Sequence, residues 1–221
     1  MLRVLSLLET RVLGVLAEKE RTVPDTYPLT LNALIAGCNQ KTSRDPVINA
    51  TEVEVQAAID SLKAMNLVIE SSGSRVARYT HNIERVLQVP KQSSALLAVL
   101  MLRGPQTAGE LRINCERLYP FGDISAVEGF LHELAERPAG ALASELPRQA
   151  GTRETRWVHL LSGPPATQDI AAHVSAPIHE ADAVAVAELA AVKANLARLD
   201  AEVSELKALL ARVCSELGIR N

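Results

Sequence analysis

Arginine, lysine and amide side chains gather in two kinds of segment where they could bind phosphates or a protein partner. Two segments read R-x-x-R-aromatic-x-H, at residues 75–81 and 153–159, and a polar loop reads NQKTSRDP at residues 39–46. Cationic side chains neutralise phosphates, and loops held by rigid elements often contact ligands. The candidate contact residues for nucleic acid or a partner are Asn39, Gln40, Lys41, Arg44, Arg75, Arg78, Arg148, Arg153 and Arg156.

Each candidate also has a structural interpretation, which we favour for any single hairpin arginine. Such arginines commonly pair with neighbouring acids, and an aromatic residue at the same strand position, Tyr79 or Trp157, is typical of a hairpin packed on a helix. Asn39 could cap a helix, and Asp, Ser and Pro are ordinary turn residues. For the 39–46 loop, a binding role and a turn both stay open.

Patterns for catalysis are missing from the sequence. The segment His132-Glu-Leu-Ala-Glu136 lacks the second histidine of a metalloprotease helix, and no nucleophile elbow, Walker loop or dinucleotide glycine pattern occurs. Cys38 and Cys115 hold equivalent positions, which favours small buried core residues over reactive thiols. No Cys-x-x-Cys pair suggests a metal site. We expect a non-enzymatic protein without cofactor or metal.

An internal repeat indicates which elements position these residues. Pro28-Leu-Thr30 followed by Cys38 recurs as Pro105-Gln-Thr107 followed by Cys115, and the two arginine segments follow in the same order. Between them, the segment TEVE at residues 51–54 matches SAVE at 125–128. The sequence therefore predicts two copies of one fold, called here repeat one (residues 5–85) and repeat two (residues 92–162).

Capping patterns and apolar spacing predict three helices and a hairpin in each repeat. In repeat one, Ser6 with Glu9 opens a helix over residues 7–20, and Thr51 with Glu54 opens the third helix. Thr30 caps a short helix between them. Strands are expected at residues 67–71 and 75–81 of repeat one. In repeat two, helices are expected at 93–103, 108–117 and 126–137, with strands near 142–147 and 154–161.

This order of elements is that of a winged helix-turn-helix. We predict a fold that is mainly α with small β-hairpins (α+β): two tandem winged helix-turn-helix domains followed by a C-terminal coiled-coil helix. The expected boundaries are 1–90 and 91–162 for the two domains, 163–180 for a linker and 181–217 for the coiled-coil helix.

The C-terminal heptads predict self-association. Apolar residues fill the a and d positions over four heptads, and Glu and Lys occupy g and e positions where a parallel partner helix would meet them. We expect a homodimer through this helix, the alternative being a helix that folds back on its own protein. The predicted self-association residues are Leu189, Val192, Leu196, Leu199, Val203, Leu206, Leu210, Val213 and Leu217.

Three long motifs in the chain resemble the YceH-like family of bacterial proteins. They are TVPDTYPLTLNALIAGCN with its continuation QKTSRDPV from Thr22, LRGPQTAGEL from Leu102 and RETRWVHLLSG from Arg153. The resemblance implies the tandem winged-helix fold. It brings no established activity, cofactor or catalytic residue to carry over.

Charge and composition narrow the function classes. Net charge is −3 over 221 residues, and each repeat region is neutral, with 10 cationic and 10 acidic residues in 1–90 and 8 of each in 91–163. Aromatic residues are 3%, which argues against the stacking platforms that hold single-stranded nucleic acid. The sequence has no apolar run of about 18 residues and no signal-peptide cleavage site, so we expect a cytoplasmic protein without membrane contact.

Two functions remain after these exclusions. The first is a DNA-associated or regulatory factor that contacts double-stranded DNA weakly through its wings. The alternative is a protein–protein interaction or scaffold module that uses the third helices and the C-terminal coil. Carboxylates on these third helices would repel phosphates, which counts against reading of the major groove. These carboxylates are Glu52, Asp60, Glu133 and Glu136; Glu54 and Glu128 have a capping role, and the same helices also expose Lys63 and Arg137.

Overall fold

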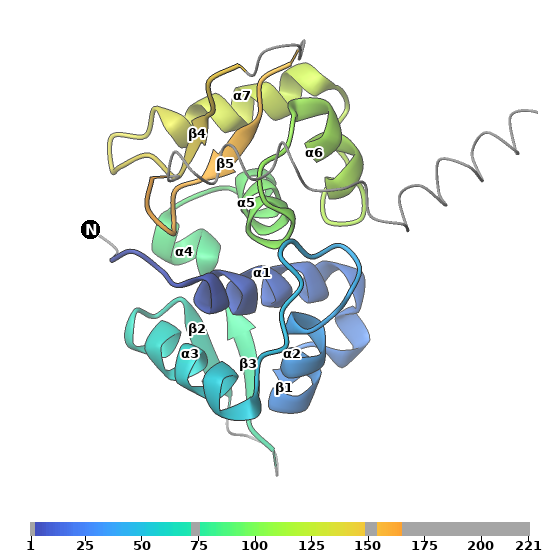
Figure 1. The fold of residues 1–221 in the computed structure, drawn as a ribbon, viewed down its shortest axis with the longest axis vertical. Helices are drawn as coiled ribbons and strands as arrows, with labels where there is room; N and C mark the ends of the chain where they lie inside the picture. Colours follow the sequence, from blue (N-terminus) through green and yellow to red (C-terminus); the bar gives the residue numbers. More distant parts are fainter. Residues whose placement is uncertain (1–2, 72–75, 149–153, 165–221) are drawn as a thin grey trace, which may run out of the picture. The chain divides into compact units, whose positions relative to one another are not determined.

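The computed structural model describes residues 3–71, 76–148 and 154–164 (Figure 1). The chain divides into two compact units, Met1–Pro165 and Ala166–Asn221. The predicted coiled-coil helix, and with it all nine self-association residues, lies outside the described residues, as do Arg75 and Arg153. The described part has an α+β fold with small antiparallel sheets.

Repeat one consists of three α-helices and a small sheet. The helices are α1 (Leu7–Thr22), α2 (Leu31–Cys38) and α3 (Glu52–Ala64), with a 3-10 turn, η1 (Pro24–Thr26), after α1. The strands are β1 (Leu29–Thr30), β2 (Val68–Ser71) and β3 (Arg78–His81), in the order β1-β3-β2 and antiparallel. Tyr79 of β3 lies opposite both Leu29 and Glu70, so β3 joins the other two strands.

Repeat two has the same order of elements. After the short helix α4 (Ile83–Leu87) come α5 (Lys91–Arg103), α6 (Ala108–Cys115), α7 (Ile124–Ala135), β4 (Ala143–Glu145) and β5 (Trp157–His159). The isolated bridge between Gln106 and Trp157 stands at the place of the β1–β3 pairing. The internal repeat of the sequence is therefore also a repeat of local structure.

The observed ends of the elements differ from the predicted ones where another residue caps the helix. Capping boxes form at Ser6 and Thr51 as predicted. Helix α7, however, begins before the predicted residue 126, because the Asp123 carboxylate accepts a hydrogen bond from the Ala126 amide at 2.7 Å. Strands β4 and β5 are shorter than predicted, and the sequence pattern did not predict α4.

Helices α1 and α5 form the centre of the first unit, and Figure 1 shows α1 between α5 and the sheet of repeat one. Both helices are buried along most of their length, at residues 9–17 and 93–102, because they pack on both sides. A Cβ added at Gly14 would lie 3.0 Å from Leu102 Cγ, so glycine is what allows this close approach. The two repeats share one hydrophobic core.

Two predictions about core residues are confirmed. Tyr79 and Trp157 are both 4% exposed, and the Trp157 ring lies edge-on against His132 of α7 with 5.1 Å between ring centroids. Cys38 and Cys115 are fully buried, and burial raises the pKa of each thiol to about 12. Such thiols stay protonated at neutral pH and are poor nucleophiles.

Candidate interaction surface

The second arginine of the repeated motif clamps its strand to the preceding segment in both repeats. Arg78 Nη1 donates to the carbonyl of Pro28 at 2.8 Å, and Arg156 Nη1 donates to the carbonyl of Pro105 at the same distance. Arg156 also forms an ion pair with Glu110 at 3.3 Å. Contact with a partner would therefore compete with bonds that hold each repeat together.

Arg44 of the 39–46 loop points into the protein. Its side chain is 0% exposed and meets the Glu18 carboxylate of α1 through two hydrogen bonds, at 3.2 and 2.6 Å. Its Nε donates to the carbonyl of Gly37 at 3.1 Å. Burial raises the pKa of Glu18, but the hydrogen bond and charge of Arg44 outweigh it, so the pKa lies below its ordinary value. An arginine held in this way does not reach a phosphate.

The amides of the same loop are also used inside the repeat. Asn39 brackets the backbone of Ala50, donating to its carbonyl at 2.8 Å and accepting from its amide at 2.7 Å. The Gln40 side-chain oxygen accepts hydrogen bonds from Arg44 and Lys19. Lys41, in contrast, is exposed. The loop is thus mainly a structural connection to α1, and a contact role stays a prediction for Lys41.

Sequence reasoning did not identify a second buried arginine in the same region. Arg11 of α1 is 0% exposed and donates to the carbonyls of Cys38, at 3.2 Å, and Pro46, at 2.6 Å. Its position in an apolar helical run gave no signal, because the carbonyls that it binds lie far along the chain. With Arg44, it ties both ends of the 39–46 loop to α1.

Two of the three acids of α3 form hydrogen bonds or ion pairs with nearby groups. Glu54 accepts from the amide and hydroxyl of Thr51 in the capping box. Asp60 accepts from Gln56 at 3.1 Å and lies 3.7 Å from Lys63, which also pairs with Glu70 on β2. Lys63 is the one cation in the sequence of α3, so Glu52 and Glu54 have no ion pair among the described residues, although Glu54 is held by its capping bonds.

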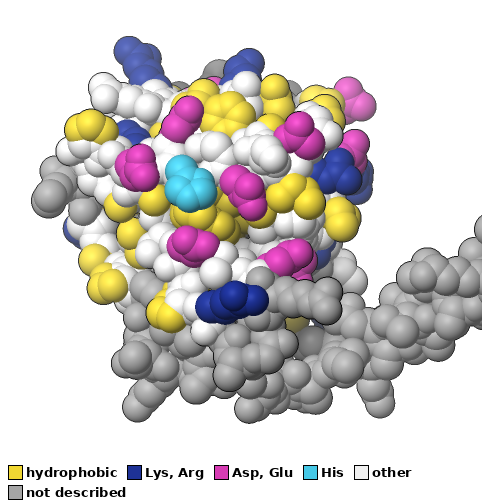
Figure 2. All heavy atoms as spheres, turned by 90° about the horizontal axis from the view of Figure 1, so that it is seen from above, with side chains coloured by type: hydrophobic (Ala, Val, Ile, Leu, Met, Phe, Trp, Pro, Cys, Tyr) yellow, Lys and Arg dark blue, Asp and Glu magenta, His cyan; other side chains and the backbone are white. Residues whose placement is uncertain are grey.

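The exposed face of α7 carries acids without a cation on the same helix. Glu128 and Glu133 are exposed, as is Glu136 at the C-cap, and the sequence of α7 contains neither lysine nor arginine. We call these three glutamates, with His132 between them, the acidic face. Figure 2 shows acidic side chains around a single histidine on this side of the molecule, with hydrophobic side chains between them.

Exposed apolar side chains occur on α7 and on the neighbouring helix α6. Ile124, the first residue of α7, is 45% exposed, and Ile113 of the neighbouring α6 is 70% exposed. His132 Nδ1 lies 2.7 Å from the carbonyl oxygen of Glu128, so Nδ1 carries a proton and donates it to that bond. A surface that mixes carboxylates with exposed isoleucines suits a basic partner with apolar side chains.

The remaining hairpin candidates do not assemble into a common site. Arg148 is exposed after β4, whereas Arg75 and Arg153 lie outside the described residues. Within the described part of the chain, no group of His, Cys, Asp and Glu is arranged to hold a metal ion. None of the helices there is long and apolar enough to cross a membrane.

Comparison with known proteins assigns the family. The family described as "Protein of unknown function, DUF480" matches residues 5–152. A UPF0502 protein of Dechloromonas aromatica is 60% identical over 206 residues, covering 93% of this chain and 94% of the relative. UPF0502 proteins of Methylibium petroleiphilum and Burkholderia multivorans are 59% and 57% identical, each over 99% of this chain and 92% and 91% of the relative.

The chain therefore belongs to this bacterial family, as the YceH-like motifs indicated.

Proposed function

We propose that the protein is a non-enzymatic tandem winged-helix module that binds a basic protein partner through the acidic face of α7. Three helices followed by an antiparallel strand pair, present in both repeats, support the winged-helix assignment. In such a fold the third helix is the usual recognition element. The observation that carries the proposal is the set of exposed carboxylates on α7, a helix without lysine or arginine; Arg137, just beyond its C-cap, donates to the Leu87 carbonyl.

Double-stranded DNA is the less suitable partner for the described residues. Arg44 is buried against Glu18, and both Arg78 and Arg156 bind backbone carbonyls. Phosphate binding depends on cations that can replace counterions, and carboxylates at the recognition helix oppose it. The same carboxylates attract lysine and arginine of a protein partner and favour one orientation of docking.

A comparative pulldown tests the acidic face. Full-length wild type is immobilised beside Glu128→Lys/Glu133→Lys, with Glu52→Lys/Asp60→Lys on α3 as a variant of equal charge change. We expect a stoichiometric basic partner to bind wild type and the α3 variant but not the α7 variant. Recovery of the same proteins by all three, with unchanged circular dichroism, would show that the acidic face is not the docking surface.

We further propose that the chain is a homodimer through its heptad helix. Leu196 and Leu206 occupy a and d positions, so aspartate at both would place charges in the apolar seam. Light scattering of Leu196→Asp/Leu206→Asp is expected to give a folded monomer. A wild-type chain that is already monomeric at micromolar concentration would rule out the dimer.

A further inference from the structure

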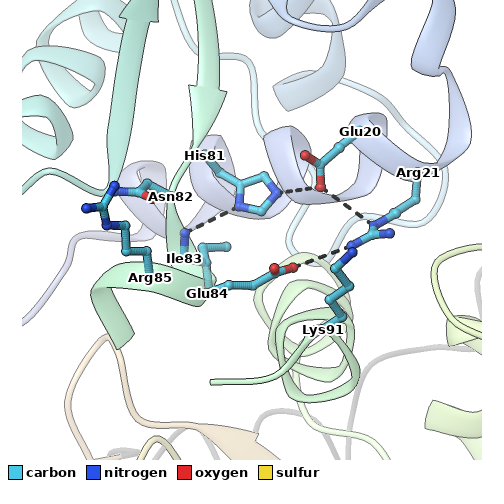
Figure 3. Close-up of a pocket in the computed structure, with 8 residues that line it drawn as sticks. All are labelled: Glu20, Arg21, His81, Asn82, Ile83, Glu84, Arg85 and Lys91. Atoms are coloured by element: carbon cyan, nitrogen blue, oxygen red, sulfur yellow. Dashed lines mark hydrogen bonds and ion pairs between the residues drawn. The ribbon is translucent and has the colours of Figure 1, made fainter. Parts of the chain in front are cut away.

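A polar hollow lies where α1, the β3–α4 connection and α5 meet (Figure 3). Its volume is about 460 Å³, large enough for a small metabolite. Glu20 and Arg21 come from the last turn of α1, His81 ends β3, and Lys91 is the first residue of α5. The other lining residues are Asn82, Ile83, Glu84 and Arg85. The start of α5 therefore completes a wall that repeat one otherwise forms.

The two carboxylates of the hollow already have partners. His81 Nε2 lies 3.0 Å from Glu20, and the Ile83 amide donates to Nδ1 of the same ring at 3.4 Å. Because Nδ1 accepts, the proton is on Nε2 and is donated to Glu20. Arg21 bridges Glu20, at 3.6 Å, and Glu84, at 3.4 Å. The hydrogen bond from His81 lowers the pKa of Glu20, with Arg21 and Lys91 adding to the effect against burial.

Cationic charge exceeds acidic charge in this hollow. Arg21, Arg85 and Lys91 line it beside two acids, and Figure 3 shows Arg85 directed toward Asn82 while Arg21 and Lys91 lie on the side of Glu84. Among the residues that the structure describes, neither Arg85 nor Lys91 forms a hydrogen bond or an ion pair with a partner. Figure 3 shows the Lys91 side chain extending from the start of α5 into the hollow that Arg21 and Glu84 also line.

We propose that this hollow binds a small molecule through an oxyanion group, phosphate or carboxylate, held by Lys91 and Arg21. An oxyanion in the hollow would accept charge-assisted hydrogen bonds from both cations. The N-terminus of α5 adds positive potential, since Pro90 provides no side-chain cap there. An oxyanion at this place would share Arg21 with Glu20 and Glu84, whereas Lys91 has no carboxylate within ion-pair distance among the described residues.

The proposal is independent of the acidic face, because the hollow contains no residue of α7. An occupant would contact both repeat one and the start of α5. Binding there would stabilise the folded unit by mass action.

Calorimetric titration of the full-length protein with inorganic phosphate, with succinate in a second arm, tests the site at constant ionic strength. We expect one anion per chain, and tighter binding in one arm identifies the preferred group. Lys91→Gln is expected to weaken binding at least about tenfold, because it removes a charge-assisted bond. The control Lys63→Gln removes a lysine of α3 outside the hollow and is expected to leave binding unchanged.

Two results would overturn the proposal. One is the absence of binding in both arms at millimolar anion. The other is equal binding by wild type and Lys91→Gln, which would place the anion elsewhere. Circular dichroism of both variants checks that the fold is retained.

Discussion

His81 and His159 end the equivalent strands β3 and β5, but their surroundings differ. His81 bonds to Glu20 at 3.0 Å in the wall of a polar hollow. His159 has a buried Nδ1 without a hydrogen-bond partner among the described residues, and burial lowers its pKa to about 4. The repeated motif therefore places a histidine at the end of the equivalent strand in both repeats. Whether that histidine has a hydrogen-bond partner depends on the helix that packs against the strand.

The two repeats also differ in which kinds of side chain pack around their helices. Repeat one buries the Arg44–Glu18 pair beneath its long loop. Repeat two packs Phe121 between Tyr119 and Phe130, with ring centroids 5.0 and 6.0 Å apart. A buried ion pair in one repeat and an aromatic cluster in the other are therefore compatible with the same order of helices and strands.

The largest expected effect comes from breaking the buried ion pair of repeat one. Arg44→Ala leaves Glu18 buried without its cation, so we expect a loss of about 3–5 kcal/mol in the free energy of unfolding. Chemical denaturation followed by circular dichroism measures it. The double variant Glu18→Ala/Arg44→Ala removes both charges and is expected to recover part of the loss. A cost near that of an exposed pair, below about 1 kcal/mol, would contradict the buried role.

The second-largest expected effect is a loss of stability at acidic pH, caused by His159 of repeat two. Between pH 6.5 and about 4 the unfolded state binds a proton at His159 that the folded state does not, so stability falls as the pH is lowered through this window. The loss amounts to up to about 3 kcal/mol. Comparing wild type with His159→Leu at each pH isolates this contribution from other groups. Parallel stability curves for the two proteins would show that His159 does not titrate in this way.

The smallest effect should be shared by the two repeats. Arg78→Ala and Arg156→Ala each remove a hydrogen bond of 2.8 Å to a proline carbonyl, so each should cost about 1 kcal/mol in the free energy of unfolding. Urea denaturation of both variants measures the difference between them. If the two variants lose free energies of unfolding that differ by more than about 1 kcal/mol, the two arginines do not stabilise their repeats equally.

Local patterns predicted much of this fold. Capping boxes at Ser6 and Thr51, the matched cysteines and the aromatic residues of the hairpins all have the expected environment, because each depends on neighbours within one or two turns or on burial alone. The start of α7 is predicted two residues too late, because the residue that caps it is Asp123.

The environment of the charged candidates could not be predicted from the sequence. Arg44 was one polar residue in a turn-like segment, and its partner Glu18 lies 26 residues earlier on α1. His81 and Glu20 are separated by 61 residues. Side chains become buried or exposed according to how α1 packs, and short-range patterns carry no information about that packing.

The most direct test of the proposed function is fluorescence anisotropy of a random-sequence DNA duplex titrated with the full-length protein at low and increasing salt. If the recognition helices serve protein binding, no binding is expected even at about 50 mM salt, where phosphate contacts are strongest. Binding that falls steeply as salt rises would demonstrate phosphate contact and contradict the assignment of the acidic face to a protein partner.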